Sequence, residues 1–224
     1  SADDTAPTVN ATRQQIACAK WIDTCEHNLP DDSAIPDASL ANTTGPIVTF
    51  LIPILADSVS SLETTLKSLH DQSNGNWEVC VAVAIEQCRT EPIMSELSLL
   101  QSRDHRLTFE FTETQNNRGE ALNLALSGAR GTLAAVIDPA DVLHPETTAW
   151  LVNALSRHPE CDVFYTDEDW IDENNSRIHP YFKSDFNALL LLTQGYLGRL
   201  TAYRRTLLEH VGGFRCDLVG AEEY

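Results

Sequence analysis

Short apolar runs alternate with amphipathic stretches over most of the chain. Runs rich in β-branched and apolar residues lie at 47–52, 77–84, 107–111, 133–137 and 161–166. Between them, apolar residues recur at helical spacing, as at Leu62, Leu66 and Leu69. Short apolar runs predict buried strands, and the 3.6-residue period predicts helices. The alternation therefore predicts an α/β fold of βαβ units, with a mainly parallel sheet flanked by helices.

The ends of the predicted strands carry the residues of chemical interest. Pro53 closes the first strand, because proline has no N–H for a ladder. The strand at 133–137 ends on Asp138, and the strand at 161–166 leads into three consecutive acids. Ligands of open α/β sheets bind outside the carboxyl ends of the strands. We therefore expect the functional residues to lie at these strand ends.

The first 46 residues differ from the rest of the chain in composition and in their apolar pattern. A helical patch covers residues 11–27, and residues 29–46 are rich in Pro, Asp, Ser, Asn and Thr. This composition is typical of a linker. We predict a helical N-terminal extension and linker at 1–46 and one domain at 47–224.

Charge and composition exclude several partners. The chain has 33 acidic and 15 basic residues, a formal net charge of −18, which repels nucleic acid and anionic lipid. Lys183 and Arg199 are interpreted as solvated surface cations. No apolar run approaches the roughly 18 residues of a membrane span, so no direct span is expected. Six cysteines without a CxxC pair favour a reduced, cytoplasmic protein.

Seven segments together resemble the family-2 glycosyltransferases of the GT-A fold, including the rhamnosyltransferase-like members that build bacterial surface polysaccharides. The segments are FLIP at 50–53, then 62–82, 121–131, 136–146, 162–172, 179–187 and 211–215. They follow the family's order over residues 47–224. The resemblance implies a Rossmann-like nucleotide-binding half, an Asp-x-Asp metal motif and a late acidic pair whose second member is the catalytic base. It also implies a domain truncated at its C-terminal end and belonging to a longer chain.

On the donor side, the resemblance implies contacts with a nucleotide-sugar at Pro53, Arg118 and Asp138, and Mn²⁺ or Mg²⁺ at Asp138 and Asp141. Ala140 stands where the family has its second aspartate, which weakens the metal site. Magnesium accepts one or two protein carboxylates, so a site of two aspartates is compatible with it. The alternative is that Asp138 only ends a strand and Asp141 only helps the turn into the next helix.

The base-binding position also departs from the family. Val83 and Ala84 stand where the family's second strand ends in two aspartates, one of which binds the nucleotide base. An alkyl group there leaves the base N–H unpaired, at a cost of about 1–3 kcal/mol. We therefore expect weakened recognition of the base.

On the acceptor side, the resemblance is closer. Asp167, Glu168 and Asp169 stand as in the family, and the last five residues resemble its Gly-x-Glu-Asp-Tyr. This implies Glu222 as an acceptor-side acid and Glu223 as the base that deprotonates the acceptor hydroxyl. A surface acid is the alternative for Glu223. Three adjacent acids also repel one another unless something offsets their charge.

Two functions stay open at this point. The first is a transferase that moves a hexosyl or deoxyhexosyl group from a nucleotide-diphosphate donor to a saccharide acceptor in surface polysaccharide synthesis. The second is a non-catalytic GT-A module, structural or acceptor-binding, within a larger multidomain glycosyltransferase. Under either, we expect further domains of a longer chain as partners and a cytoplasmic location, peripheral at the inner membrane through those domains.

Overall fold

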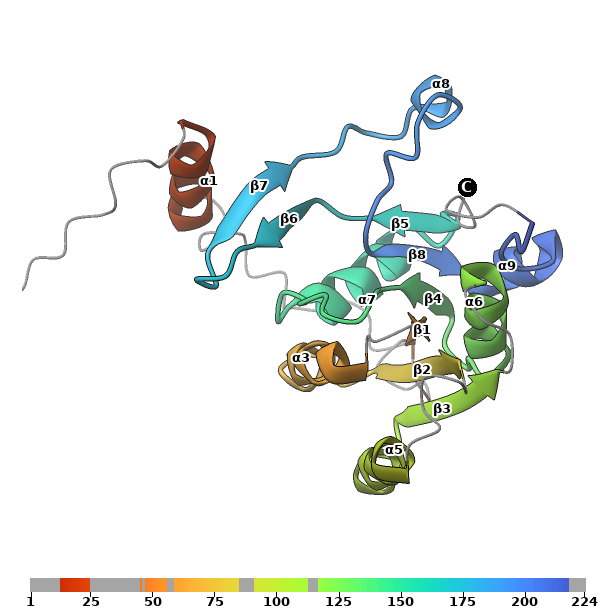
Figure 1. Cartoon of the computed structure of the whole chain (residues 1–224). Coiled ribbons are helices and arrows are strands. Elements are labelled where there is room, and N and C mark those ends of the chain that lie inside the picture. Colours follow the sequence, from red (N-terminus) through yellow and green to blue (C-terminus); the bar gives the residue numbers. More distant parts are fainter. Residues whose placement is uncertain are drawn as a thin grey trace, which may run out of the picture.

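The computed structural model describes residues 13–24, 45, 47–55, 59–84, 91–112 and 117–217. At its centre is a six-stranded sheet with the order β3-β2-β1-β4-β8-β5 (Figure 1). The strands are β1 Val48–Ile54, β2 Trp77–Ala84, β3 Leu107–Thr112, β4 Leu133–Val136, β5 Val163–Tyr165 and β8 Thr201–Arg204. Strands β1 to β4 are parallel, and β8 runs antiparallel to β4 and β5. The predicted α/β class with a mainly parallel sheet is confirmed.

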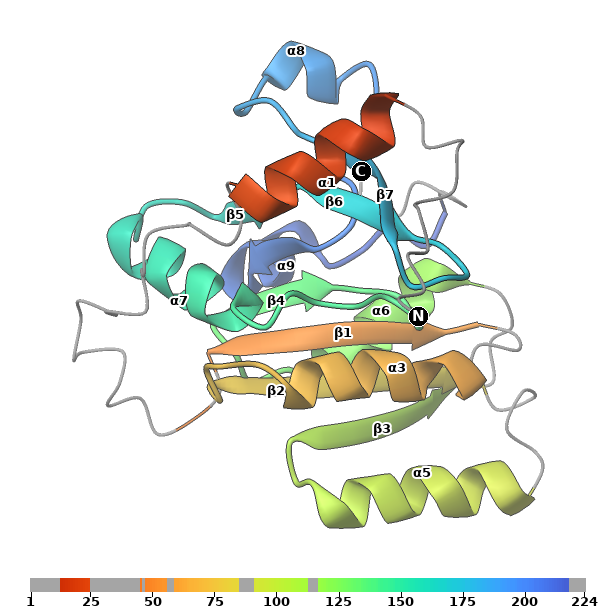
Figure 2. The ribbon, with the colours of Figure 1, turned by 90° about the vertical axis from the view of Figure 1, so that its left-hand side faces the viewer.

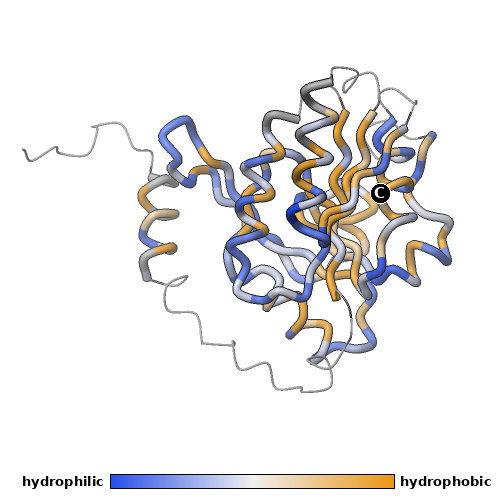
Figure 3. Tube along the Cα trace, turned by 90° about the horizontal axis from the view of Figure 1, so that it is seen from below, coloured by the Kyte–Doolittle hydropathy of each residue, from blue (hydrophilic) through white to orange (hydrophobic). Residues whose placement is uncertain are grey.

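Helices cover both faces of this sheet (Figure 2). They are α3 Val59–His70, α5 Glu91–Arg103, α6 Arg118–Ser127, α7 Thr147–Arg157 and α9 Arg205–Val211. Leucines of α3, α5 and α7 pack against one face, and α6 and α9 pack against the other. The strands carry the most apolar part of the chain (Figure 3). Removing two apolar layers from water is the main stabilising term of such a three-layer fold.

Strand β1 continues through Pro53, whereas the sequence predicted a strand of 47–52 that this proline closes. The backbone polar groups of Leu51 point toward β4, because its C=O accepts the N–H of Ile137 at 3.1 Å. Pro53 lies two residues further along β1, so its backbone nitrogen points to the same side as Leu51. It stands beyond Val136, where β4 ends. Its missing N–H therefore removes no bond to β2, so the β1–β2 pairing continues to Ile54.

The C-terminal third departs most from the sequence prediction. The mixed segment 178–205 contains β8, which the apolar pattern did not reveal, and the strand expected at 161–166 is only three residues long. Helix α7 begins at Thr147. Helix α9 ends at Gly212, which takes the left-handed conformation with φ 87°.

A hairpin and two helices lie outside the sheet. The hairpin consists of β6 Glu168–Ile171 and β7 Arg177–Tyr181, and it is followed by the short helix α8 Ala188–Leu191. Helix α1 Arg13–Thr24 lies beside β7 (Figure 1), with ring centroids of Trp21 and Phe182 5.3 Å apart. The predicted boundary at residue 46 stays a prediction, since residues 1–12, 25–44 and 46 lie outside the described ranges. Within the described ranges, no helix is long and apolar enough to cross a membrane.

Candidate functional site

Charged side chains from three separate elements meet at the carboxyl edge of the sheet. Asp138 follows β4, Arg118 begins α6, and Arg199 lies in the loop before β8. The Asp138 carboxylate forms ion pairs with both Arg118 and Arg199. The Arg199 guanidinium also lies 3.7 Å from the Asp141 carboxylate. The structure thus brings together the predicted residues Asp138, Asp141 and Arg118, and it adds Arg199.

The turn after β4 orients the two aspartates. The N–H of Asp138 donates to Asp141 Oδ2 at 2.8 Å, and the N–H of Asp141 donates to the Asp138 C=O at 3.1 Å. Ala140, at the tip, has φ 77°, a left-handed conformation that costs a non-glycine residue about 1–2 kcal/mol. Asp141 therefore does close this turn, as one of the two interpretations of the sequence proposed, while its carboxylate also stands beside Arg199.

These residues offer a poor set of ligands for a divalent metal. Asp138 and Asp141 already face two guanidinium groups, and Ala140 supplies no ligand atom. The two carboxylates and two guanidiniums have a formal charge of zero, whereas hard divalent cations are held by net negative oxygen ligands. In the described part of the chain, the one group of three potential metal-binding side chains is His158, Glu160 and Cys161, after α7.

The loop that carries Arg199 is held by an ion pair whose lysine is buried. Lys183 Nζ, on a side chain only 1% exposed, lies 3.1 Å from Glu168 Oε2 and also donates to the Leu197 C=O. The same Glu168 oxygen accepts the N–H of Arg199 at 2.6 Å. Gly198 has φ 61°, and a Cβ there would lie 2.7 Å from the Glu168 carboxylate. The position of Arg199 thus depends on Glu168 and Lys183.

Each of the three consecutive acids has a partner. Asp167 accepts the N–H of Lys183 at 2.7 Å, and Asp169 forms an ion pair with Arg177 across the hairpin. Together with the Glu168–Lys183 pair, these contacts offset the repulsion expected from the sequence. The interpretation of Lys183 as a solvated surface cation is wrong, because its side chain is buried.

The ends of β1 and β2 are apolar. Val83 is 0% and Ala84 3% exposed, so buried alkyl groups occupy the positions expected to bind the base. Pro53 is buried beside them, paired with Ala82. Its contact with a donor stays a prediction.

The segment after α9 is clamped to α6. Asn123 exchanges two hydrogen bonds with the backbone of Phe214, at 2.8 and 2.9 Å. Asn117 donates to the Cys216 C=O at 3.1 Å, beside the start of α6 where Arg118 lies. Glu222 and Glu223, the predicted acceptor-side acid and base, lie outside the described residues.

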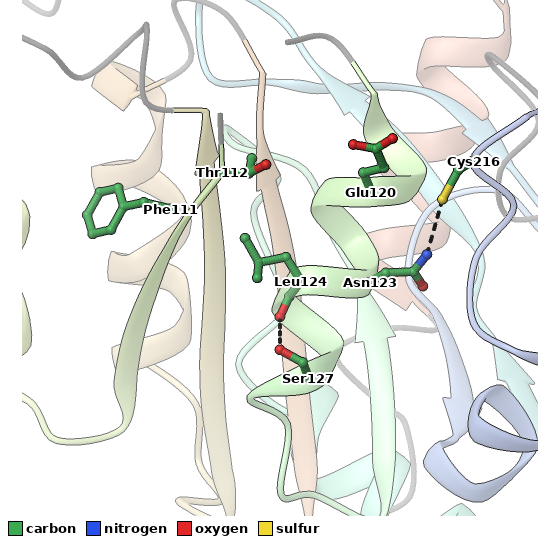
Figure 4. Close-up of a pocket in the computed structure, with 7 residues that line it drawn as sticks. All are labelled: Phe111, Thr112, Glu120, Asn123, Leu124, Ser127 and Cys216. Carbon is green, nitrogen blue, oxygen red and sulfur yellow. Dashed lines mark hydrogen bonds between the residues drawn. The ribbon is translucent and has the colours of Figure 1, made fainter. Parts of the chain in front are cut away.

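The clamp forms one side of a shallow, open hollow of about 530 Å³ (Figure 4). The hollow lies between the end of β3 and α6, and Figure 4 shows Glu120 and Asn123 lining it from α6 and Cys216 from the clamped segment. Asp138 is not among its lining residues, so the hollow is distinct from the charged cluster.

Comparison with known proteins decides the family. The family model for Glycosyl transferase family 2 matches residues 49–212, which include the whole charged cluster. The chain belongs to this family. It is 32% identical over 181 residues to uncharacterized protein y4gI of Sinorhizobium fredii, and 27% identical over 178 residues to the O-antigen biosynthesis protein RfbC of Myxococcus xanthus. The matches cover 80% and 79% of this chain but only 20% and 14% of those relatives.

Solved structures support the GT-A fold of this family 2 domain. Staphylococcus aureus TarS 1–349 in complex with UDP matches with a TM-score of 0.57 and 20% identity, over 79% of this chain and 52% of TarS. The mannosyltransferase PcManGT from Pyrobaculum calidifontis, in complex with GDP-Man and Mn²⁺, matches with a TM-score of 0.55 and 21% identity, over 80% and 50%. At these identities the likeness establishes the fold, and the predicted GT-A architecture is confirmed.

Proposed function

We propose that this family 2 domain binds a nucleotide-diphosphate sugar at the carboxyl edge of β1 and β4 and transfers the sugar to a saccharide acceptor. The observation that carries the proposal is the convergence of Arg118 and Arg199 on Asp138 at this edge. Arginine binds phosphate oxygens in a bidentate manner, and the edge is where ligands of α/β sheets bind. TarS with UDP and PcManGT with GDP-Man, which share the fold, add support for a nucleotide donor.

In this proposal each candidate residue has a role in an inverting displacement. Glu223 removes the proton of an acceptor hydroxyl, whose oxygen attacks the anomeric carbon from the side opposite the diphosphate. The guanidinium groups at Asp138 stabilise the negative charge that develops on the departing diphosphate. Glu222 and the acids of the hairpin form the acceptor side, and Pro53 shapes the floor of the donor edge. A metal at Asp138 and Asp141 stays a prediction, and the ion pairs there support another source of positive charge.

Calorimetry with UDP, GDP and dTDP sugars tests the donor site. The proposal predicts that one of these nucleotide sugars binds. It also predicts that Asp138→Asn or Arg118→Ala weakens this binding at least tenfold. The matched control is Arg103→Ala, an exposed arginine at the end of α5. Absence of binding by all three sugars, with and without Mn²⁺, would remove the basis for a transferase.

A non-catalytic GT-A module is the second candidate, and the buried alkyl side chains of Val83 and Ala84 favour it. If it is correct, the natural chain binds no nucleotide, and aspartates introduced at Val83, Ala84 and Ala140 create binding. Equal affinity of natural and substituted proteins would contradict this candidate.

The comparisons also support a setting for either function. RfbC is named for O-antigen biosynthesis, which supports a surface polysaccharide as the product. Both relatives are several times longer than this chain, which supports further domains as partners. We propose that the module is cytoplasmic and that such domains place it at the periphery of the inner membrane.

A further inference from the structure

We infer that this domain holds the donor diphosphate through Arg118 and Arg199 without a divalent metal, with Arg199 bridging the Asp138 carboxylate and the phosphate oxygens. The inference rests on the proposed function and states how the donor site obtains its positive charge. It arises from Arg199, which lies at the place where the sequence predicts a metal.

Charge is the first argument. A metal that bridges carboxylates and a diphosphate is attracted by the negative charge of both groups. Here Asp138 has two guanidinium partners and Asp141 faces one of them, so the cluster is formally neutral before any ion arrives. A metal would have to compete with Arg118 and Arg199 for the carboxylate oxygens, and the cation would meet their repulsion.

The shape and exposure of Arg199 are the second argument. A guanidinium has five N–H donors in a planar fork, so it can bond a carboxylate on one edge and phosphate oxygens on another. The Arg199 side chain is 55% exposed, whereas Arg118 is 23% and Asp138 21% exposed. Arg118 and Asp138 are thus the less exposed members of the cluster, and the guanidinium of Arg199 is its more exposed cation.

The anchoring of the loop is the third argument. The backbone of Arg199 is held by Glu168, and Glu168 is held by the buried Lys183. The left-handed Gly198 allows this close approach. A cation fixed in advance loses less conformational freedom when it binds a ligand, so a positioned arginine is suited to binding phosphate. Glu168 and Lys183 are positioning residues for Arg199.

Calorimetry of UDP, GDP and dTDP, each in EDTA and each in Mn²⁺, tests the inference. We expect the nucleotide that binds to have the same affinity in both buffers, and Arg199→Ala to weaken it about tenfold or more, which is about 1.4 kcal/mol. The nucleotide affinity of Arg199→Lys should lie between those of the natural protein and Arg199→Ala, because lysine keeps the charge but lacks the planar fork of N–H donors. Arg103→Ala is the control, and an unchanged melting temperature of the Arg199 variants verifies folding.

The alternative outcomes separate the two proposals. Binding that requires Mn²⁺ would overturn the inference and leave the proposed function standing. Absence of binding in EDTA and in Mn²⁺ alike would overturn both the inference and the proposed function. Equal affinity of Arg199→Ala and the natural protein would overturn the inference alone.

A second readout needs no nucleotide. Free Mn²⁺ has a characteristic electron paramagnetic resonance signal, which falls when protein binds the ion. We expect the natural protein and Asp138→Asn to lower it equally, whereas the double substitution of Arg199→Ala and Ala140→Asp should lower it further. A loss of signal in the natural protein that Asp138→Asn abolishes would overturn the inference.

Discussion

Strands β1 and β2 are buried along their whole length, whereas β6 is half-buried to exposed, β7 alternates and α8 has no buried residue. The sheet is held by apolar layers on both faces. The hairpin and the loop before β8 are held by ion pairs, such as Lys183 with Glu168 and Arg177 with Asp169. Asp138 stands where these two regions meet.

The difference shows how a site can be divided between two kinds of structure. The packed sheet fixes Asp138 and the start of α6, because close-packed interiors resist displacement. The ion-paired region supplies Arg199 from a loop whose stability depends on a few polar contacts. Substitutions in the sheet should therefore change global stability, and substitutions in the hairpin should change local order and ligand binding.

The largest effect is expected from Phe50→Ala in β1. Phe50 is 0% exposed, and truncation of a buried phenylalanine costs about 3–5 kcal/mol. Urea unfolding followed by circular dichroism measures the loss. The matched control is Phe186→Ala beyond the hairpin, where the side chain is 67% exposed and the expected change is within about 0.5 kcal/mol. Similar losses for the two variants would abolish the distinction between the regions.

The next effect is expected from Lys183→Met. It leaves Glu168 and the Leu197 C=O without their cationic partner, a cost of about 1–3 kcal/mol. Hydrogen exchange should rise across residues 166–199 and stay unchanged in β1 and β2. Adding Glu168→Met should recover part of the loss, because an apolar pair of similar size can replace a buried ion pair. Uniformly increased exchange over the whole sheet would show that the hairpin is not an independent unit.

Gly198→Ala should have a smaller effect, about 1 kcal/mol or slightly more, because it adds a Cβ against Glu168 and places alanine at φ 61°. The melting temperature and the nucleotide affinity are the quantities to measure, and both should fall. Gly75→Ala is the control, since a Cβ there meets nothing within 4 Å. If the two variants behave alike, the close packing around Glu168 does not determine the position of the loop.

The sheet was predictable because its signals are local. The strands β1 to β4 and their helices have apolar periods that the sequence shows directly. Strand β8 was missed because its four residues, Thr201–Arg204, lie in a mixed segment and gain their strand conformation from pairing with β4 and β5. Long-range pairing of this kind has no local pattern.

The candidate site was predictable only in part, for the same reason. Asp138 and Asp141 follow an apolar strand, and Arg118 begins a helix, so strand ends and family likeness pointed to them. Arg199 lies far along the chain in a loop and has no motif of its own. Its position depends on Glu168 and the buried Lys183, and the sequence presented that lysine as an ordinary surface cation.

The smallest effect concerns an ion pair at the rim of the packed sheet, where Arg106 bonds Asp104 at 2.7 Å and lies 3.7 Å from the Trp77 ring centroid. The side-chain hydrogen bond from Arg106 holds the pKa of Asp104 below the ordinary 3.8. A lowered carboxyl pKa adds stability that is present above the ordinary value and is lost as pH falls through the lowered one.

Asp104→Asn should therefore destabilise the protein by about 1 kcal/mol or less near neutral pH, and the difference should vanish as pH falls below the lowered pKa. Urea unfolding of the natural protein and of Asp104→Asn, from neutral pH down to below the lowered pKa, measures this difference in stability. The control is Asp71→Asn, at an exposed position. In the packed sheet an ion pair adds only a small increment to apolar burial, whereas in the hairpin the Lys183 pair holds the loop in place. A loss from Asp104→Asn as large as that from Lys183→Met would contradict this ordering.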